Sequence, residues 1–338
     1  MLYNPKVSII TPTYNQEKLI GDCIKSVINQ TYIYWEMIII DDGSTDNTKG
    51  VIEQYLYDPR IKYIYQDNKG PNFLAENYNK ALNCASGELI AILEGDDYWP
   101  KEKLEKQVPA FQNNEIVLSY GDYIITDIKG KLELPHRLGH LPENIRHNTP
   151  VGTASLFMLR GEGATFTYPV TVVIRKETLL EIGGFLQCTY APLVDYSTFL
   201  HLGLKGKFHY AEGVVGFWRR RITSITSTKR LFIYEGVRRY GKEFFDLNKE
   251  LSLFKNSNWN DIEKSWKKGI NRAYIEKGRM ELLKGDWDSA RKSFTKLLNS
   301  PRTFLKGIIG IIAAILKKDV ERIFKMKNGY SLLDFKED

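Results

Sequence analysis

The chain of 338 residues has few cysteines and no long hydrophobic run. Its three cysteines, Cys23, Cys84 and Cys188, lie far apart and include no CxxC pair, which argues against a disulfide framework or a zinc site and indicates a reducing compartment. No stretch approaches the roughly 20 apolar residues that span a bilayer. No basic and apolar leader precedes the strand-like segment at Val7, so we expect no secretory signal. These absences predict a cytoplasmic protein, free or peripheral on the inner face of the cytoplasmic membrane.

The charge of the chain is uneven rather than extreme. The formal net charge is +7. Acidic residues outnumber basic residues by 14 to 8 in the first hundred positions, whereas basic residues outnumber acidic residues by 22 to 14 in the last hundred. The basic residues do not alternate with aromatic residues on a recognisable nucleic-acid-binding module, so we expect no nucleic-acid partner. The asymmetry predicts a metal-carrying site near the N-terminus and contact with an anionic surface near the C-terminus.

The first hundred residues alternate between strand-like and helix-like segments joined by short connections. Strands are expected at 7–10, 36–40, 61–65 and 88–93, and helices at about 19–28, 45–55 and 72–84. This order predicts a mostly parallel sheet with helices on its faces. Ligands of such sheets bind beyond the carboxyl ends of the strands, where the turn at 11–15 and the acidic runs after the second and fourth strands should meet.

The acidic run after the fourth strand is the most informative motif. Asp96 and Asp97 directly follow an apolar segment at 89–93 that reads as a buried strand. Carboxylates crowded at the end of a buried strand cost free energy unless a positive group neutralises them. The usual partner is a hard divalent cation with oxygen ligands, together with the phosphates that the cation carries. The motif therefore predicts an enzyme that acts on a nucleotide-activated substrate.

The pattern changes along the rest of the chain. Residues 111–228 are mixed, whereas the residues after 228 are helical and rich in Lys, Leu and Ile. Within 271–301, five residues lie near the offsets of one tetratricopeptide-type helical hairpin: Gly278, Gly285, Ala290, Phe294 and Pro301. A single hairpin cannot bury its own apolar face, so it must pack on the catalytic body or on a partner.

A segment near the C-terminus is apolar over most of its surface and has many basic neighbours. The apolar residues are Phe304, Leu305, Ile308, Ile309, Ile311, Ile312, Ile315 and Leu316, and the basic ones are Arg302, Lys306, Lys317, Lys318, Arg322, Lys325 and Lys327. We expect an amphipathic helix in contact with an anionic membrane, because a buried helix would not need so dense a basic flank. The alternatives are packing on the preceding hairpin and a homodimer through the C-terminal helices.

These motifs, in this order, resemble the family 2 glycosyltransferases of the GT-A fold. The matching segments are 7–10 with 13–15, 30–32, 40–46, 85–87, 94–99 and 183–185. The resemblance covers about residues 5–225. It implies an α/β fold with a Rossmann-like, mostly parallel central sheet flanked by helices, and a C-terminal α-helical extension. The implied parts are a donor-binding half at 1–110, an acceptor-binding and catalytic half at 111–228, and the helical extension at 229–338.

The resemblance also implies the residues that bind a nucleotide-diphosphate sugar donor. Three residues at the first two strand ends would contact its nucleotide: Pro12, Tyr14 and Asp42. Glu94-Gly95-Asp96 occupies the family's DxD position, with Glu where Asp is commoner, and Asp97 directly follows it. Asp96, with Asp97 close by, would hold Mn²⁺ or Mg²⁺ on the donor's two phosphates.

On the acceptor side, the resemblance makes Asp195 the general base, although Val194 replaces the acid that usually precedes it. Such a base takes the proton of the acceptor hydroxyl in a single displacement with inversion. Trp218 and Arg219 are the expected acceptor contacts. Two features depart from the family pattern. Glu76 stands where Arg is common, so a contact to the donor phosphates is either missing or supplied by Lys69, Lys80 or Arg219. The QxxRW motif of polymerising members is absent, which predicts addition of one sugar per acceptor.

The predicted function is an inverting, metal-dependent glycosyltransferase whose acceptor is a saccharide or lipid-linked saccharide of a bacterial surface polysaccharide. A polyprenyl phosphate or a protein side chain is the alternative acceptor. Glu76 and Val194 leave open a non-catalytic nucleotide-sugar-binding or scaffold protein of a polysaccharide assembly complex. A nucleotidyltransferase is expected to have a glycine-rich and basic loop after the first strand. Thr11–Asn15 contains no glycine, lysine or arginine, which argues against that function.

Overall fold

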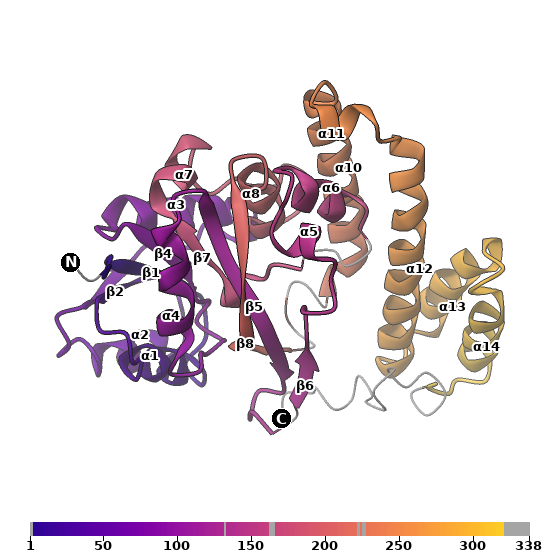
Figure 1. The fold of residues 1–338 in the computed structure, drawn as a ribbon. Coiled ribbons are helices and arrows are strands. Elements are labelled where there is room, and N and C mark those ends of the chain that lie inside the picture. Colours follow the sequence, from indigo (N-terminus) through magenta and orange to yellow (C-terminus); the bar gives the residue numbers. More distant parts are fainter. Residues whose placement is uncertain (1–2, 132, 162–165, 222–223, 225–227, 321–338) are drawn as a thin grey trace. The chain divides into compact units, whose positions relative to one another are not determined.

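The computed structural model describes residues 3–131, 133–161, 166–221, 224 and 228–320 and divides the chain into two compact units (Figure 1). Unit 1 comprises Met1–Met158 and Gly163–Arg219, and unit 2 comprises Leu159–Glu162 and Arg220–Asp338. Unit 1 thus includes nearly all of the two halves expected for the catalytic domain, and unit 2 includes the whole expected helical extension. Arg322, Lys325 and Lys327 of the predicted basic flank lie outside the described residues.

Unit 1 is built on one eight-stranded sheet with the order β3-β2-β1-β4-β7-β5-β6, in which β8 also pairs with β5. The strands are β1 (Val7–Thr13), β2 (Trp35–Asp41), β3 (Ile61–Tyr65), β4 (Leu89–Ile92), β5 (Ile116–Thr126), β6 (Glu133–His136), β7 (Val173–Arg175) and β8 (Lys207–Arg219). The four N-terminal strands pair in parallel, as β8 does with β5, whereas β6 and β7 are antiparallel to their neighbours. The prediction of a mostly parallel central sheet is confirmed.

Helices connect and cover these strands. They are α1 (Ile20–Ile28), α2 (Thr48–Glu53), α3 (Leu74–Cys84), α4 (Lys103–Gln107), α5 (Glu143–Arg146), α6 (Thr153–Leu159), α7 (Lys176–Glu181) and α8 (Asp195–Leu202), with 3₁₀ turns η1 (Pro71–Phe73), η2 (Val108–Gln112) and η3 (Pro169–Thr171). The buried residues of α1, Ile20, Cys23, Ile24 and Val27, recur at helical spacing. They join the core beside the apolar residues of β1, β2 and β4. Burial of each large aliphatic side chain is worth about 1.5–3 kcal/mol.

The carboxyl ends of β1, β2 and β4 meet at one edge of the sheet, because these strands run in the same direction. The backbone amide of Asp42 donates to the carbonyl of Thr13 at 3.0 Å, and the amide of Gly95 donates to the carbonyl of Pro12 at 3.1 Å. Three segments distant in sequence are therefore tied together backbone to backbone. This edge is the one at which ligands of such sheets bind.

The opposite edge of the same sheet holds a buried carboxylate, that of Glu36 near the start of β2. Its Oε1 accepts hydrogen bonds from Ser8 Oγ at 2.7 Å and from the Ser86 backbone amide at 2.6 Å. Its Oε2 accepts from Lys6 Nζ at 3.1 Å and Lys62 Nζ at 2.9 Å. Burial alone would raise the pKa of Glu36, but the hydrogen bonds from Ser8, Ser86 and Lys62 lower it far below its usual range.

Unit 2 is helical, which confirms the predicted C-terminal extension. Its helices are α10 (Arg230–Asn248), α11 (Ser252–Lys255), α12 (Trp259–Leu283), α13 (Trp287–Thr295) and α14 (Phe304–Ile315), with the 3₁₀ turn η4 (Lys296–Asn299). Asn258 caps α12 by accepting from the amide of Asn260, and Asp286 caps α13 by accepting from the amide of Ser289. Between these helices Gly285 has a φ of 75°, which favours glycine.

The helices α12, α13 and α14 lie side by side (Figure 1). The ring of Phe294 on α13 is fully buried and faces a glycine on each neighbouring helix. A Cβ at Gly278 of α12 would lie 2.6 Å from the ring, and a Cβ at Gly310 of α14 would overlap it. Within the described ranges, none of the helices combines the length and the apolar composition that crossing a membrane requires.

Candidate active site

Three acidic side chains gather just beyond the end of β4. One carboxylate oxygen from each of Glu94, Asp96 and Asp97 can be chosen so that all three lie within 4.8 Å of one another. Asp97 is buried, and the other two are half-buried. Burial, followed by the charges of Asp96 and Glu94, raises the pKa of Asp97 well above its usual range. A divalent cation would neutralise this crowded charge, and an all-carboxylate donor set fits Mn²⁺ or Mg²⁺.

The backbone of the acidic turn is held tightly. The amide of Asp97 donates to the carbonyl of Glu94 at 2.9 Å. A Cβ at Gly95 would lie 2.9 Å from both Thr13 Oγ1 and Ile20 Cδ1, so only glycine lets the turn approach β1 and α1 this closely. Tyr78 on α3 donates its hydroxyl to Glu94 Oε1 at 2.8 Å. The carboxylates are thus positioned by three elements besides their own strand.

Arg219, the last residue of β8, links this turn to α1. Its backbone amide donates to Asp97 Oδ1 at 2.8 Å, and its Nη1 donates to the carbonyl of Asp96 at 3.3 Å. Its Nη2 donates to Asp22 Oδ2 at 2.7 Å, and its guanidinium carbon lies 4.4 Å from the centroid of the Tyr98 ring. The side chain is almost fully buried. Arg219 therefore contributes positive charge beside the acidic turn.

The sequence reasoning did not identify Asp22, whose carboxylate orients Arg219. Asp22 lies in the first turn of α1 and is half exposed, which is also the usual setting of a solvated helix acid. No local signal distinguishes the two cases, since Arg219 is 197 positions away along the chain. The expected acceptor contact of Arg219 stays a prediction.

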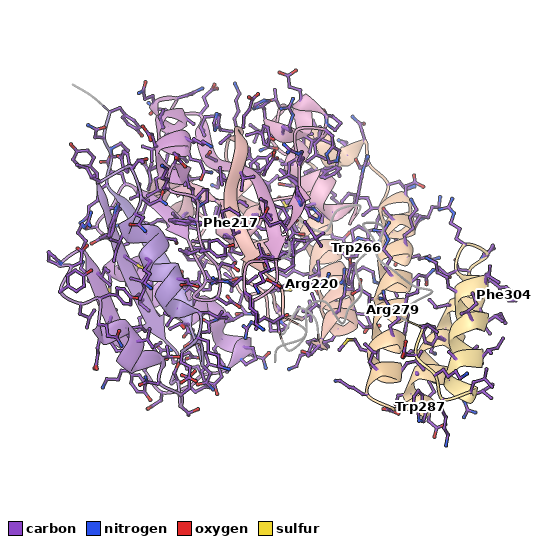
Figure 2. All side chains as sticks on the ribbon, turned by 90° about the horizontal axis from the view of Figure 1, so that it is seen from below. Phe217, Arg220, Trp266, Arg279, Trp287 and Phe304 are labelled. Atoms are coloured by element: carbon purple, nitrogen blue, oxygen red, sulfur yellow. The ribbon has the colours of Figure 1, made fainter. Side chains whose placement is uncertain are left out.

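Trp218, the other expected acceptor contact, is half-buried and packs against the core of unit 1. Its ring stacks on Tyr168, with centroids 5.4 Å apart and an interplanar angle of 30°. The neighbouring residue Phe217 stacks on Tyr98 at 4.6 Å, and Figure 2 labels its position. These contacts give Trp218 a packing role, and its contact with an acceptor stays a prediction.

Asp195 begins α8 and is half-buried. Burial raises the pKa of its carboxyl, although hydrogen bonds from the Tyr196 and Asp195 backbone amides oppose the shift. The hydroxyl of Tyr78 is influenced both by Asp195 and by the acidic turn. The pKa of Tyr78 is raised first by burial and then by Glu94, with further contributions from Asp195 and Asp96. The charges of Glu94, Asp96 and the candidate base Asp195 thus all act on one tyrosine hydroxyl, which donates to Glu94.

Asp42, at the end of β2, is buried and its carboxylate is well supplied with donors. Its Oδ1 accepts from Gln66 Nε2 at 2.8 Å and from the Lys69 amide at 3.1 Å, and its Oδ2 accepts from the Gly70 amide at 3.2 Å. The segment that supplies these donors follows β3; of its residues, the sequence predicted only Lys69 as part of the site, and not as a donor to Asp42. Tyr14 is 47% exposed at the same sheet edge, which leaves its ring accessible to a ligand.

The residues considered as replacements for the missing arginine at position 76 all have acidic or polar partners. Lys69 Nζ lies 2.5 Å from Glu76 Oε2, and Lys80 Nζ donates to Gln66 Oε1 at 3.0 Å. Lys69 shares its segment with the donors to Asp42. Glu76 thus pairs with the ammonium group of Lys69, whose backbone amide donates to Asp42 in the expected nucleotide site.

Comparison with known proteins identifies relatives of this chain. TuaG of Bacillus subtilis (strain 168), provisionally named a teichuronic acid biosynthesis glycosyltransferase, is 35% identical over 175 residues, or 49% of this chain and 67% of TuaG. The Escherichia coli UDP-Glc:alpha-D-GlcNAc-diphosphoundecaprenol beta-1,3-glucosyltransferase WfgD is 36% identical over 166 residues, or 48% of this chain and 64% of WfgD.

Two solved structures share the fold, each with a TM-score of 0.53. S. aureus TarS 1-349 in complex with UDP-GlcNAc is 16% identical, and the match covers 93% of this chain and 92% of TarS 1-349. The mannosyltransferase PcManGT from Pyrobaculum calidifontis, in complex with GDP-Man and Mn²⁺, is 17% identical, with 94% and 87% covered. The sequence profile of Glycosyl transferase family 2 matches residues 8–183, just over half of the chain. The chain therefore belongs to glycosyl transferase family 2 and is a glycosyltransferase.

Proposed function

We propose that the protein transfers a sugar from a nucleotide-diphosphate donor to a hydroxyl acceptor by a metal-dependent, inverting reaction. The observation that carries the proposal is the clustering of the Glu94, Asp96 and Asp97 carboxylates just beyond the end of β4. One set of carboxylates has the chemistry of a divalent-cation site, and a separate carboxylate has a raised pKa suited to proton transfer.

Glu94, Asp96 and Asp97 would hold Mn²⁺ or Mg²⁺, which when bound supplies positive charge to the diphosphate leaving group. Asp195 accepts the proton of the acceptor hydroxyl. The acceptor oxygen then forms a bond to the anomeric carbon as the bond from that carbon to the diphosphate oxygen breaks. The electron pair leaves with the nucleoside diphosphate, and the configuration at the anomeric carbon inverts. Arg219 keeps the carboxylate of Asp97 in place through its backbone amide.

Pro12, Tyr14 and Asp42 form the proposed nucleotide site within residues 1–110. A carboxylate such as that of Asp42 accepts hydrogen bonds from the ring or amino N–H groups of a base, and the exposed ring of Tyr14 offers a flat surface for it. The solved relatives in complex with UDP-GlcNAc and GDP-Man support a nucleotide sugar as the donor.

The proposed acceptor is a lipid-linked saccharide of a bacterial surface polysaccharide, bound by residues 111–228 with Trp218 and Arg219 among the contacts. The names of TuaG and WfgD support this choice, since one refers to teichuronic acid and the other to a diphosphoundecaprenol-linked sugar. A lipid-linked acceptor would place the enzyme on the inner face of the cytoplasmic membrane as a peripheral protein.

The test separates donor binding from proton transfer. Binding of UDP-, GDP-, dTDP- and CDP-sugars is screened in the presence of Mn²⁺. The correct donor should raise the melting temperature of the protein in proportion to ln(1 + [L]/Kd). Asp195→Asn should lower transfer or donor hydrolysis by about 10²–10⁴-fold while keeping the metal-dependent thermal shift. Asp288→Asn is the matched control, because Asp288 is highly exposed on α13, and it should behave as wild type. Wild-type turnover in Asp195→Asn would contradict the proposed base, and the absence of any metal-dependent donor shift would contradict the proposed site.

A further inference from the structure

The helix α14 has an unusual distribution of residue sizes. Its buried residues are small: Gly307, Gly310, Ala313 and Ala314. They pack against α13 and η4, where a Cβ at Gly307 would lie 3.0 Å from the Phe294 carbonyl oxygen. The helix therefore already uses its small-residue face for packing within unit 2. The alternative in which α14 packs on the preceding hairpin holds for this face alone.

The opposite face of α14 carries the large apolar residues. Leu305 is 70% exposed, Ile312 50% and Ile315 63%, and with the half-buried Ile308 they recur at helical spacing on one side of the helix. Phe304 and Leu316 extend this side at the two ends and are also exposed. Figure 2 shows Phe304 on the side of α14 that faces away from Arg279 on α12. We call Phe304, Leu305, Ile308, Ile312, Ile315 and Leu316 the aliphatic face.

Positive charge surrounds the aliphatic face. Arg302 precedes α14 and Lys306 lies in its first turn, and Lys317 and Lys318 follow the residue that caps its C-terminal end; all four side chains are exposed. The sequence from Pro301 to Lys318 contains no Asp or Glu. A stripe of large apolar side chains bounded by cations at both ends combines apolar insertion with attraction to anionic headgroups.

We propose that the aliphatic face of α14 docks onto an anionic phospholipid bilayer, with the helix parallel to the membrane surface. A helix of 12 residues is too short to span the hydrocarbon core, which needs about 20, so insertion is limited to the headgroup region. A second copy of the chain is a poorer fit, because two aliphatic faces in contact would bring two sets of four cations together. This inference deepens the proposed peripheral location by naming the surface that makes the contact.

The test uses the full chain and vesicles without donor or acceptor, so its result is independent of sugar transfer. Flotation of the protein with vesicles of phosphatidylcholine alone is compared with flotation with vesicles that also contain phosphatidylglycerol. Wild type should bind the anionic vesicles much more strongly than the neutral ones. The double variant Leu305→Gln/Ile312→Gln should bind at least about tenfold more weakly. Lys317→Gln/Lys318→Gln should lose about fivefold for each charge removed.

The matched control is Leu247→Gln, because Leu247 on α10 is 84% exposed but lies outside the aliphatic face; it should bind as wild type does. The proposal would be overturned if the wild-type protein did not bind anionic vesicles, or if the Leu305→Gln/Ile312→Gln variant bound them as strongly as wild type does. It would also be overturned by a wild-type dimer, seen by light scattering, that the same substitutions convert to a monomer. If those substitutions disrupt helical circular dichroism, the Lys317→Gln/Lys318→Gln pair decides, and unchanged binding by it overturns the proposal.

Discussion

The two edges of the unit 1 sheet shift the pKa of a buried carboxyl group in opposite directions. At the amino ends of the strands, the Glu36 carboxylate is surrounded by donors from Ser8, Ser86, Lys6 and Lys62, and its pKa is lowered. At the carboxyl ends, Asp97 is buried beside other carboxylates and its pKa is raised.

The difference separates a structural carboxylate from a functional one. Every hydrogen-bond donor around Glu36 comes from the protein itself, so the fold gains free energy from the charge. The charges around Asp97 are held together at a cost to the fold, which an enzyme recovers when a cation and a phosphorylated substrate bind. The comparison predicts that removing one charge at each edge will have opposite consequences for activity and stability.

The largest expected effect is that of Asp96→Asn on catalysis. The rate of sugar transfer with Mn²⁺ should fall on the order of 10²–10³-fold. An amide would hold the cation more weakly than the Asp96 carboxylate does, and the positive charge of that cation stabilises the leaving group. The free energy of unfolding without ligand should not fall, because the substitution relieves repulsion within the acidic turn. Steady-state kinetics and urea unfolding measure the two quantities, and a variant that is both active and destabilised would reverse the comparison.

The second effect is the loss of stability in Glu36→Gln. An amide cannot accept from both lysines and from Ser86 as the carboxylate does, so unfolding should require about 2 kcal/mol less. Glu53→Gln is the matched control, since Glu53 is exposed and its ion pair with the exposed Lys49 is long, at 3.8 Å; it should change stability by less than about 0.5 kcal/mol. Transfer per folded molecule should stay at the wild-type value. A Glu36→Gln protein as stable as the control would show that the network is energetically neutral.

The smallest effect is a difference in pH dependence. Glu36 has a folded pKa below its unfolded value of about 4.3, so its stabilisation is present above that pH and is lost as the pH falls below it. Asp195 must be ionised to act as a base, and its pKa is raised by burial. As the pH is lowered below this raised pKa, the value of kcat/KM should therefore fall about tenfold per pH unit. This loss of activity should begin at a higher pH than the loss of stability. An activity limb at or below the ordinary Asp value of about 3.9 would argue against Asp195 as the base.

Much of the fold was predictable because local patterns determine it. Alternating apolar segments identified the first four strands, and the direction of a parallel sheet then placed the acidic runs at one edge. The observed β1 extends to Thr13 rather than to residue 10, because pairing with β2 continues through the polar end of the strand.

The partners of individual charges were not predictable, because they depend on strand order and register. Ser8, Ser86 and Lys62 reach Glu36 from three separate neighbouring segments. Arg219 reaches Asp97 because the long strand β8 runs beside β5 with two irregularities in register after Gly121. No helical or strand period in the sequence encodes such a shift.

The buried ring of Phe294 has a consequence for how this chain can diverge. Since no methyl group fits at Gly278 or Gly310 while the ring is present, a larger residue at either position must be accompanied by a smaller one at 294. Among relatives that retain these three helices, the three positions should covary as a single unit. A relative that keeps Phe at 294 and carries alanine at both glycine positions would need wider spacing between its helices.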